Sequence, residues 1–225
     1  MTVSDHIRVR RVSEDWQRRE ALSVLRATYV DEKGWVAGAE RVFPSEEVGD
    51  PEVSWFLALV GQEPAGVLRV LYELPLAEYA HYDFQPIGGA DLGLDTLLCD
   101  ARVAEIGRFA VVPAYRRMPL VAAELIRAAS IETLQRGYTH YITDVFEGER
   151  HSPYLFHTRV LGFRPIATHD TGELNCPNRR ITMLLDLAEA YRRLCTSQGW
   201  LYRYLRRALA QAALLMQPEE LMKAG

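Results

Sequence analysis

The sequence predicts a three-layer α/β fold in which a central, mixed and twisted sheet is flanked by helices. Three observations carry this prediction. Strand-like runs and a hairpin signal fill the first half, and strands alternate with helices from residue 102 onward. Beyond residue 187, apolar residues recur at helical spacing, which predicts a helical tail. We therefore expect one domain over residues 1–187 and a helical extension over 188–225.

The first half predicts three strands and one long helix. His6–Val12 alternates and predicts a strand, after which Ser13 and the acids behind it favour a helix start. This helix should direct Trp16, Ala21, Leu22, Leu25 and Tyr29 toward the core. The runs WFLALV and AGVLRVLYEL flank GQEP and predict a hairpin. Residues 73–101 mix aromatics with turn formers, so we expect irregular structure with a functional or mobile role.

The second half predicts the βα units of the fold. A strand over Val103–Val111 precedes a helix from about Leu120 to Arg136, and a strand follows in GYTHYITDV. SPYLFHTRVLGF predicts a helix closed by Gly162, and FRPIATHD and RRITMLLDL predict two strands.

Composition excludes several functional classes. The net charge of −4 gives no support for nucleic-acid binding. No apolar run is long enough to span a bilayer, so we expect peripheral membrane contact at most. The first residues lack the apolar core of a secretory signal, and we expect a cytoplasmic protein. Cys99, Cys176 and Cys195 are widely spaced, which predicts reduced thiols, no disulfide framework and no metal site.

The segment FAVVPAYRRMPLV carries the first resemblance. Its strand end, Pro113, Tyr115 and Arg116 resemble the V-x-P-x-Y-R segment of the GNAT acyltransferases, where two glycines normally follow. Here these positions hold Pro119 and Val121. Glycine lets a backbone approach a phosphate closely, and proline has no N–H to donate. We therefore expect the pyrophosphate of free coenzyme A to be held poorly.

A narrower resemblance begins at EIGRFAV, residues 105–111. It is similar to the E-x-S-R-F-A-V signature of the acyl-homoserine-lactone (autoinducer) synthases, with Gly107 in place of serine. Further residues match other positions of that family: Arg26, Tyr29, Gly34, Trp35, Glu47, Asp50 and Arg69. The resemblance implies an acyl group delivered as a phosphopantetheine thioester on acyl carrier protein, with no permanently bound cofactor.

The C-terminal half resembles a sister group, the bacterial N-acyl amino acid synthases. The end of FHTRVLGF is similar to their YxxLLGF helix end, and Asn175, Pro177 and the run LLDL resemble their closing strand. The resemblance spans roughly residues 20–187. It implies a fatty acyl transfer from acyl carrier protein to the amine of an amino acid.

Three residues are candidates for the chemistry. Glu105 is the expected base for the acceptor ammonium, with pairing to Arg108 as the alternative. On a regular strand these two side chains face opposite sides, so a bulge at Gly107 is needed to bring them into one cleft. His157 takes the tyrosine place of YxxLLGF and is the expected acid for the leaving thiolate. Tyr154 is the alternative acid, and a structural His157 is also open.

Further residues are candidates for binding. The backbone amides around Phe109 and Val111 are expected to meet the oxyanion, although Phe109 also suits core packing. Arg116 and Arg117 are expected to bind the carrier's phosphopantetheine phosphate or its acidic residues, unless they form a solvated helix start.

The early residues of the family pattern suggest the acceptor site. Arg26 and Arg69 suit the acceptor carboxylate, and Glu47 and Asp50 suit its ammonium. The alternative for these charged residues is a stabilising ion network around a mobile N-terminal lid. Tyr29 and Trp35 would pack this lid on the acyl chain, and their alternative is to anchor the loop to the core.

The sequence leaves four functions open. The first is the N-acyl amino acid synthase, and the second is an autoinducer synthase that uses S-adenosylmethionine and releases methylthioadenosine. The third is an acetyl-CoA-dependent N-acetyltransferase, and the fourth is a module that binds acyl carrier protein without catalysis. They share a fold, so the fold alone does not separate them.

Overall fold

The computed structural model describes residues 6–72, 81–89 and 101–213. Eight strands form a sheet with the order β1-β2-β3-β5-β6-β8-β7-β4. β5 and β6 run parallel, whereas β1/β2, β2/β3, β6/β8, β7/β8 and β4/β7 are antiparallel, so the predicted mixed sheet is confirmed. The strands are β1 (Ile7–Arg11), β2 (Val53–Val60), β3 (Glu63–Leu71), β4 (Gln85–Pro86), β5 (Val103–Val111), β6 (His140–Phe146), β7 (Arg164–His169) and β8 (Arg180–Asp186).

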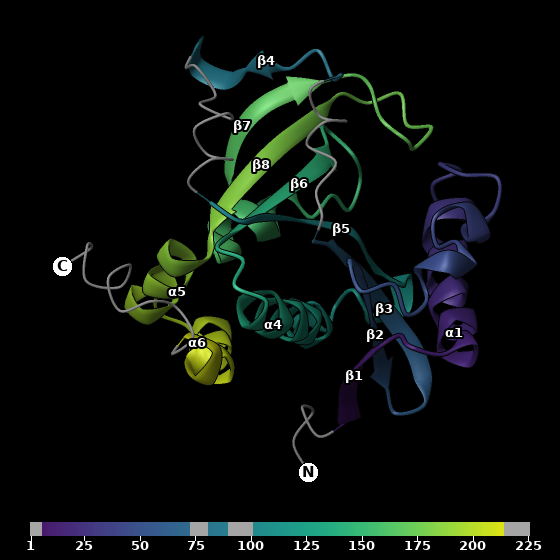
Figure 1. Cartoon of the computed structure of the whole chain (residues 1–225), viewed down its shortest axis with the longest axis horizontal. Helices are drawn as coiled ribbons and strands as arrows, with labels where there is room; N and C mark the ends of the chain where they lie inside the picture. The colour runs from purple at the N-terminus through teal and green to yellow at the C-terminus, as the bar shows by residue number, and fades with distance from the viewer. Residues whose placement is uncertain (1–5, 73–80, 90–100, 214–225) are drawn as a thin grey trace. The chain divides into compact units, whose positions relative to one another are not determined.

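Helices accompany the sheet, as Figure 1 shows. The α-helices are α1 (Asp15–Leu25), α4 (Pro119–Gln135), α5 (Leu187–Thr196) and α6 (Trp200–Ala213). Two π-helical segments are η2 (Arg26–Val30), which continues α1, and η7 (Phe156–Leu161). The short 3₁₀ turns are η3 (Ala39–Arg41), η4 (Ser45–Glu47), η5 (Ile87–Gly89) and η6 (Pro113–Tyr115).

The chain divides into two compact units, and the division falls inside β5. The first unit contains Met1–Glu73 and Ile106–Ser130, and the second contains Leu74–Glu105 and Ile131–Gly225. The division expected from the sequence, with a boundary at 187/188, is a different one and stays a prediction.

The first unit is built on the hairpin of β2 and β3. β2 is apolar except for Ser54 and is buried on both faces, as expected for a strand covered by other elements. α1 packs on β3 and directs Ala21, Val24 and Leu25 into the core. Gly66 of β3 permits close packing, because a Cβ there would lie 2.9 Å from the Ala110 carbonyl oxygen.

The second unit is built on β6, β8 and β7. β8 pairs with β6 along its full length, which buries Met183 completely. α5 begins directly after β8, where the Asp186 carboxylate accepts a hydrogen bond from the Glu189 amide at 2.9 Å and caps the helix. α6 packs on α5 and buries Leu205.

Three details differ from the sequence-based expectations. α1 is capped at Glu14 rather than Ser13, with the Gln17 amide oxygen accepting from both backbone amides. Trp16 is 38% exposed and faces solvent instead of the core. The irregular stretch contains β4. The expected helical tail is confirmed over the described residues, where it consists of α5 and α6. Cys99, which the sequence analysis also considered, lies outside the described residues.

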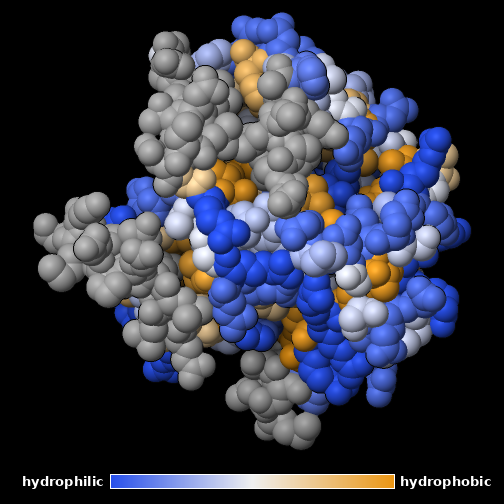
Figure 2. Space-filling view, viewed as in Figure 1, coloured by the Kyte–Doolittle hydropathy of each residue, from blue (hydrophilic) through white to orange (hydrophobic). Residues whose placement is uncertain are grey.

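Hydrophilic residues cover much of the face drawn in Figure 2, with smaller hydrophobic areas between them. The large apolar side chains that are most exposed in the described ranges are Trp16, Ile87, Leu155 and Trp200. Of the helices that the structure describes, none is both long and apolar enough to cross a membrane.

Candidate functional site

The strand β5 carries a backbone irregularity at Arg108. Its φ of +50° lies in the left-handed region, where a non-glycine residue costs about 1–2 kcal/mol. Such residues cluster at functional sites, because the surrounding structure must hold them in place. The sequence analysis expected an irregularity between Glu105 and Arg108 and assigned it to Gly107. The structure places the positive φ one residue later.

Glu105 lies in the parallel ladder between β5 and β6. In the described residues this ladder has three residue pairs, and Glu105 pairs with Ile142. Its side chain is half-buried. A carboxylate in this position retains access to solvent and is not enclosed in the core. Its catalytic role stays a prediction.

A cluster of aromatic and cationic groups forms beside Arg108 within the first unit. Tyr29 is buried, and burial raises the pKa of its hydroxyl, while the Arg108 and Arg69 guanidinium groups act in the opposite direction. The Tyr29 hydroxyl therefore lies in the field of two arginines. We call Tyr29, Glu47, Trp55, Arg69 and Arg108 the arginine–aromatic cluster.

Trp55 of β2 contacts several side chains in and beside this cluster. Its indole N–H donates to a Glu47 carboxylate oxygen at 2.5 Å, and its ring stacks on Phe43 with centroids 4.1 Å apart. The Arg69 guanidinium lies 5.9 Å from the Trp55 ring centroid and 3.7 Å from the other Glu47 oxygen. Arg69 is only 6% exposed, so its charge is balanced locally by Glu47.

Trp35 joins the cluster through Tyr29. The two rings meet edge to face with centroids 5.2 Å apart, and the Trp35 amide donates to the Tyr29 carbonyl at 2.9 Å. Tyr29 lies in the π-helical segment η2, a conformation often found at functional sites. The structure therefore brings together Tyr29, Trp35, Arg69 and Arg108 of the predicted residues.

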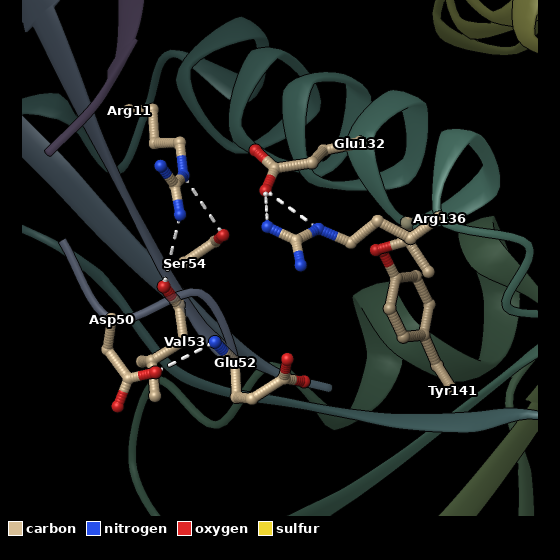
Figure 3. A network of polar contacts seen from close by, with 9 residues as sticks. Arg11, Asp50, Glu52, Val53, Ser54, Glu132, Arg136 and Tyr141 are labelled. Carbon is tan, nitrogen blue, oxygen red and sulfur yellow. Dashed lines mark hydrogen bonds and ion pairs between the residues drawn. The ribbon is translucent and has the colours of Figure 1, made fainter. Parts of the chain in front are cut away.

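Arg26 and Asp50 have other contacts. The Arg26 guanidinium pairs with Glu40 at 3.4 Å, and both side chains are more than half exposed. The Asp50 carboxylate accepts a hydrogen bond from the Glu52 amide at 2.8 Å and so closes the turn before β2, as Figure 3 shows. These contacts favour the structural alternative for both residues.

Figure 3 also shows Arg11 bound to Ser54 and Val53 of β2, and, from the second unit, Glu132 of α4 paired with Arg136, which follows the helix. The Arg11 contacts join β1 to β2, and the Glu132–Arg136 pair spans one turn at the end of α4. We therefore assign Arg11, Glu132 and Arg136 a structural role and no part in catalysis.

In the turn between β5 and α4, backbone amides donate hydrogen bonds to carbonyl groups of the same segment. The Met118 amide donates to Tyr115 at 2.9 Å and the Val121 amide donates to Met118 at 3.0 Å. Pro119 begins α4 and has no N–H. The amides available to a pyrophosphate are therefore reduced by sequence and by hydrogen bonding alike.

Arg116 is held in the same turn. Its Nε donates to the Val111 carbonyl at 3.0 Å, and its Nη1 and Nη2 donate to the two Glu32 carboxylate oxygens. This bidentate pair competes with any phosphate for the guanidinium. Arg117 is exposed, so of the two predicted phosphate ligands it is the better placed. Phe109 and Val111 are half-buried and close β5.

His157 lies in the second π-helical segment, η7. It is 2% exposed and stacks on Phe163 with ring centroids 4.9 Å apart. Burial lowers its pKa to about 4, against a smaller opposing effect of the Pro153 carbonyl. The imidazole is thus neutral at pH 7, which favours a packing role over donation from an imidazolium. Tyr154, one turn earlier, is half-buried.

We expect His157 to make the protein sensitive to acid. Because its folded-state pKa is lowered from 6.5, the neutral form stabilises the fold fully above pH 6.5, and this contribution is lost as the pH falls toward 4. The loss reaches about 3 kcal/mol. Urea unfolding at pH 7 and pH 4.5 should show it for the wild type and not for His157→Phe. Equal acid losses in both proteins would contradict the assignment.

The sequence analysis missed Glu32, Trp55 and Phe43. Glu32 neutralises Arg116, and its signal was only its place in the charged DEKG segment. Trp55 was assigned to a strand, and its polar indole N–H in an otherwise apolar run was the signal that it needs an acceptor.

Comparisons with known proteins bear on the fold. No protein-family model matches the sequence, and no curated protein matches it. Among solved structures it is similar to FeeM, an N-acyl amino acid synthase from uncultured soil microbes, with a TM-score of 0.63 and 19% identity over 88% of this chain and 97% of that chain.

Two further solved structures have the same arrangement. An N-acetyltransferase from Staphylococcus aureus matches with a TM-score of 0.56 and 13% identity, covering 80% of this chain and 98% of that chain. Aminoglycoside 6'-acetyltransferase type Ii matches with a TM-score of 0.53 and 18% identity, covering 80% of this chain and 96% of that chain. The chain therefore has the fold of the GNAT acyltransferases.

Proposed function

We propose that the protein is an N-acyltransferase that moves a fatty acyl group from acyl carrier protein to the amine of an amino acid. The arginine–aromatic cluster is the observation that carries this proposal. The GNAT fold and the similarity to FeeM support it, because FeeM is described as an N-acyl amino acid synthase.

The cluster suits a zwitterionic acceptor. Arg69 and Arg108 supply guanidinium groups for a carboxylate, and the Tyr29 hydroxyl supplies a further donor. Glu47, 3.7 Å from Arg69, supplies a carboxylate for an ammonium group. An amino acid presents both charges at short separation, whereas a simple amine presents only one.

The turn before α4 supports a carrier-bound donor. Free coenzyme A needs backbone amides for its pyrophosphate, and here Met118 and Val121 donate theirs to the chain itself. A phosphopantetheine arm carries one phosphate and no pyrophosphate. The exposed Arg117 guanidinium can donate hydrogen bonds to this single phosphate.

The reaction needs three events. Glu105 takes a proton from the acceptor ammonium, and the neutral amine attacks the thioester carbonyl to form a C–N bond. The backbone amides near Phe109 and Val111 stabilise the oxyanion of the tetrahedral intermediate. The attacking nitrogen then loses a second proton to water, and collapse of the intermediate breaks the C–S bond. The proton held by Glu105 passes to the thiolate, so the products are the neutral amide, the thiol and one proton released to solvent.

The first experiment is mass spectrometry of lipid extracts from a bacterium that expresses the chain, with Glu105→Ala as the control. A new N-acyl amino acid that is absent from the control establishes the reaction. Purified protein with palmitoyl-acyl carrier protein and single amino acids then identifies the acceptor. Absence of any acylated amino acid in both assays would refute the proposal.

The second candidate is an autoinducer synthase. EIGRFAV, with Arg108 in its left-handed conformation, favours it, since the segment resembles that family's signature. The discriminating product is methylthioadenosine, released only when S-adenosylmethionine is the acceptor. Its appearance together with an acyl lactone in the purified reaction would replace the first proposal with this one.

We expect free coenzyme A to bind weakly, with a Kd above about 1 mM, because Pro119 offers no amide to its pyrophosphate. A Pro119→Gly/Val121→Gly variant restores backbone freedom and should bind about tenfold more tightly. Isothermal titration calorimetry measures both. Micromolar binding by the wild type would favour an acetyl-CoA-dependent enzyme instead.

A further inference from the structure

The C-terminal helices α5 and α6 form a cationic surface on a chain of the opposite net charge. Residues 187–213 contain five arginines and one glutamate, with no lysine or aspartate, while the whole chain has 26 basic and 30 acidic residues. Arg203 and Arg207 of α6 are exposed and lie on one helix face with Trp200, at spacings of three and seven. We call Trp200, Arg203 and Arg207 the α6 stripe.

The arginines of this region are not neutralised by the described part of the chain. Elsewhere, Arg69, Arg116, Arg127 and Arg136 pair with glutamates of the same unit. Neither Arg203 nor Arg207 has a carboxylate partner among the described residues. Trp200 is 52% exposed beside them, so the α6 stripe combines a large aromatic surface with two available guanidinium groups.

The helices are fixed to the segment that carries His157. The Arg159 carbonyl, in η7, accepts hydrogen bonds from Arg193 of α5 at 2.8 Å and from the Tyr202 hydroxyl of α6 at 3.0 Å. Gly162 packs against the same arginine, since a Cβ there would lie 3.1 Å from Arg193 Cδ. A partner on α6 is therefore bound to a defined position next to η7.

We propose that the α6 stripe is the docking surface for the acidic carrier protein that delivers the acyl thioester. This inference rests on the proposed function for the identity of the partner. Arginine matches carboxylates bidentately, so a protein surface rich in aspartate and glutamate complements the stripe. The observations favour a protein over an anionic membrane. The apolar face of α6 is already buried on α5, with Leu205 at 0% and Ala212 at 2% exposure, and is not free to enter a bilayer.

The test compares charge reversal on α6 with charge reversal elsewhere. Arg203→Glu/Arg207→Glu is the test variant, and Arg8→Glu/Arg19→Glu, also exposed and of equal charge change, is the matched control. Fluorescence anisotropy measures binding to labelled palmitoyl-acyl carrier protein without acceptor, at 50 and 300 mM salt. We expect about tenfold weaker binding at 50 mM salt for the test variant alone, and a smaller difference at 300 mM.

Three further readouts make the result decisive. Acylation from palmitoyl-pantetheine, which lacks a carrier, should be unchanged in the test variant. Unchanged carrier binding by that variant, or an equal loss in the control, overturns the inference even if the wild type makes an N-acyl amino acid. Loss of binding to vesicles of phosphatidylglycerol and phosphatidylcholine, with carrier binding intact, assigns the stripe to a membrane and also overturns it.

One outcome separates this inference from the proposed function, and a second variant covers a loss of stability. If the wild type binds carrier through the stripe but acylates no amino acid, docking stands and the function fails. If the charge-reversed variant melts below the wild type, Arg203→Gln/Arg207→Gln replaces it, and a carrier affinity equal to the wild type then refutes docking.

Discussion

Glu105→Gln lowers kcat for acyl transfer by about 10²–10⁴-fold at pH 7, the range that a general base contributes. The substitution preserves the size of the side chain and removes only its ability to accept a proton. Because Glu105 is half-buried in a short ladder with β6, we expect the melting temperature to change little. Steady-state assays with acyl carrier protein and the acceptor amino acid measure the loss.

The pH dependence separates base catalysis from a structural ion pair. As the pH rises toward the pKa of the acceptor amine, more amine is already neutral, and the deficit of Glu105→Gln should shrink. A structural pair with Arg108 predicts a constant deficit. Glu132→Gln is the control, because Glu132 of α4 pairs with Arg136 one helical turn away, and we expect this variant to retain full activity.

Most strands of the sheet could be predicted because the residues of each strand carry a strand-like pattern of their own. β5 is rich in apolar residues, among them the β-branched Val103, Ile106 and Val111, and its observed bounds, Val103–Val111, agree with the expected ones. β4 could not be predicted, since two residues, Gln85 and Pro86, carry no periodicity and gain their strand character from pairing with β7. Trp16 was misassigned because helical spacing identifies a face and does not show how far the core reaches.

The site was predictable in its composition and less so in its contacts. Tyr29, Trp35, Arg69 and Arg108 form contacts or share an electrostatic environment, as the family pattern suggested. Arg26 and Asp50 belong to the same pattern yet pair with Glu40 and the Glu52 amide. The spacing of residues in the sequence does not show which carboxylate an arginine will pair with, because the path of the intervening loop determines which groups lie close together.

The two π-helical segments were also beyond sequence reasoning. The pattern of FHTRVLGF predicted a helix ending at Gly162, which the structure confirms with a left-handed Gly162 at φ 95°. It gave no sign that the helix would widen around His157. The widened turn buries the imidazole and lowers its pKa, so the most reactive side chain in the motif is neutral.

Arg69→Ala is the second large effect, and it acts on stability and on acceptor binding together. Removal of the guanidinium leaves the Glu47 carboxylate, with a side chain only 17% exposed, without its cation. It also removes the cation from the Trp55 ring. Breaking a buried pair from one side costs about 3–5 kcal/mol, so chemical unfolding should show a loss near the lower end of this range.

The double variant Arg69→Ala/Glu47→Gln distinguishes the unpaired charge from lost packing. Neutralising Glu47 should recover part of the lost stability, because the buried carboxylate no longer lacks a cation. Acceptor binding should not recover, since the guanidinium that meets the carboxylate is still absent. We therefore expect KM for the amino acid to stay raised at least tenfold while KM for the acyl carrier is unchanged. If KM for the amino acid instead returned to the wild-type value with stability, Arg69 would be a structural partner of Glu47 and Trp55, and the acceptor carboxylate would have to be assigned to Arg108 alone.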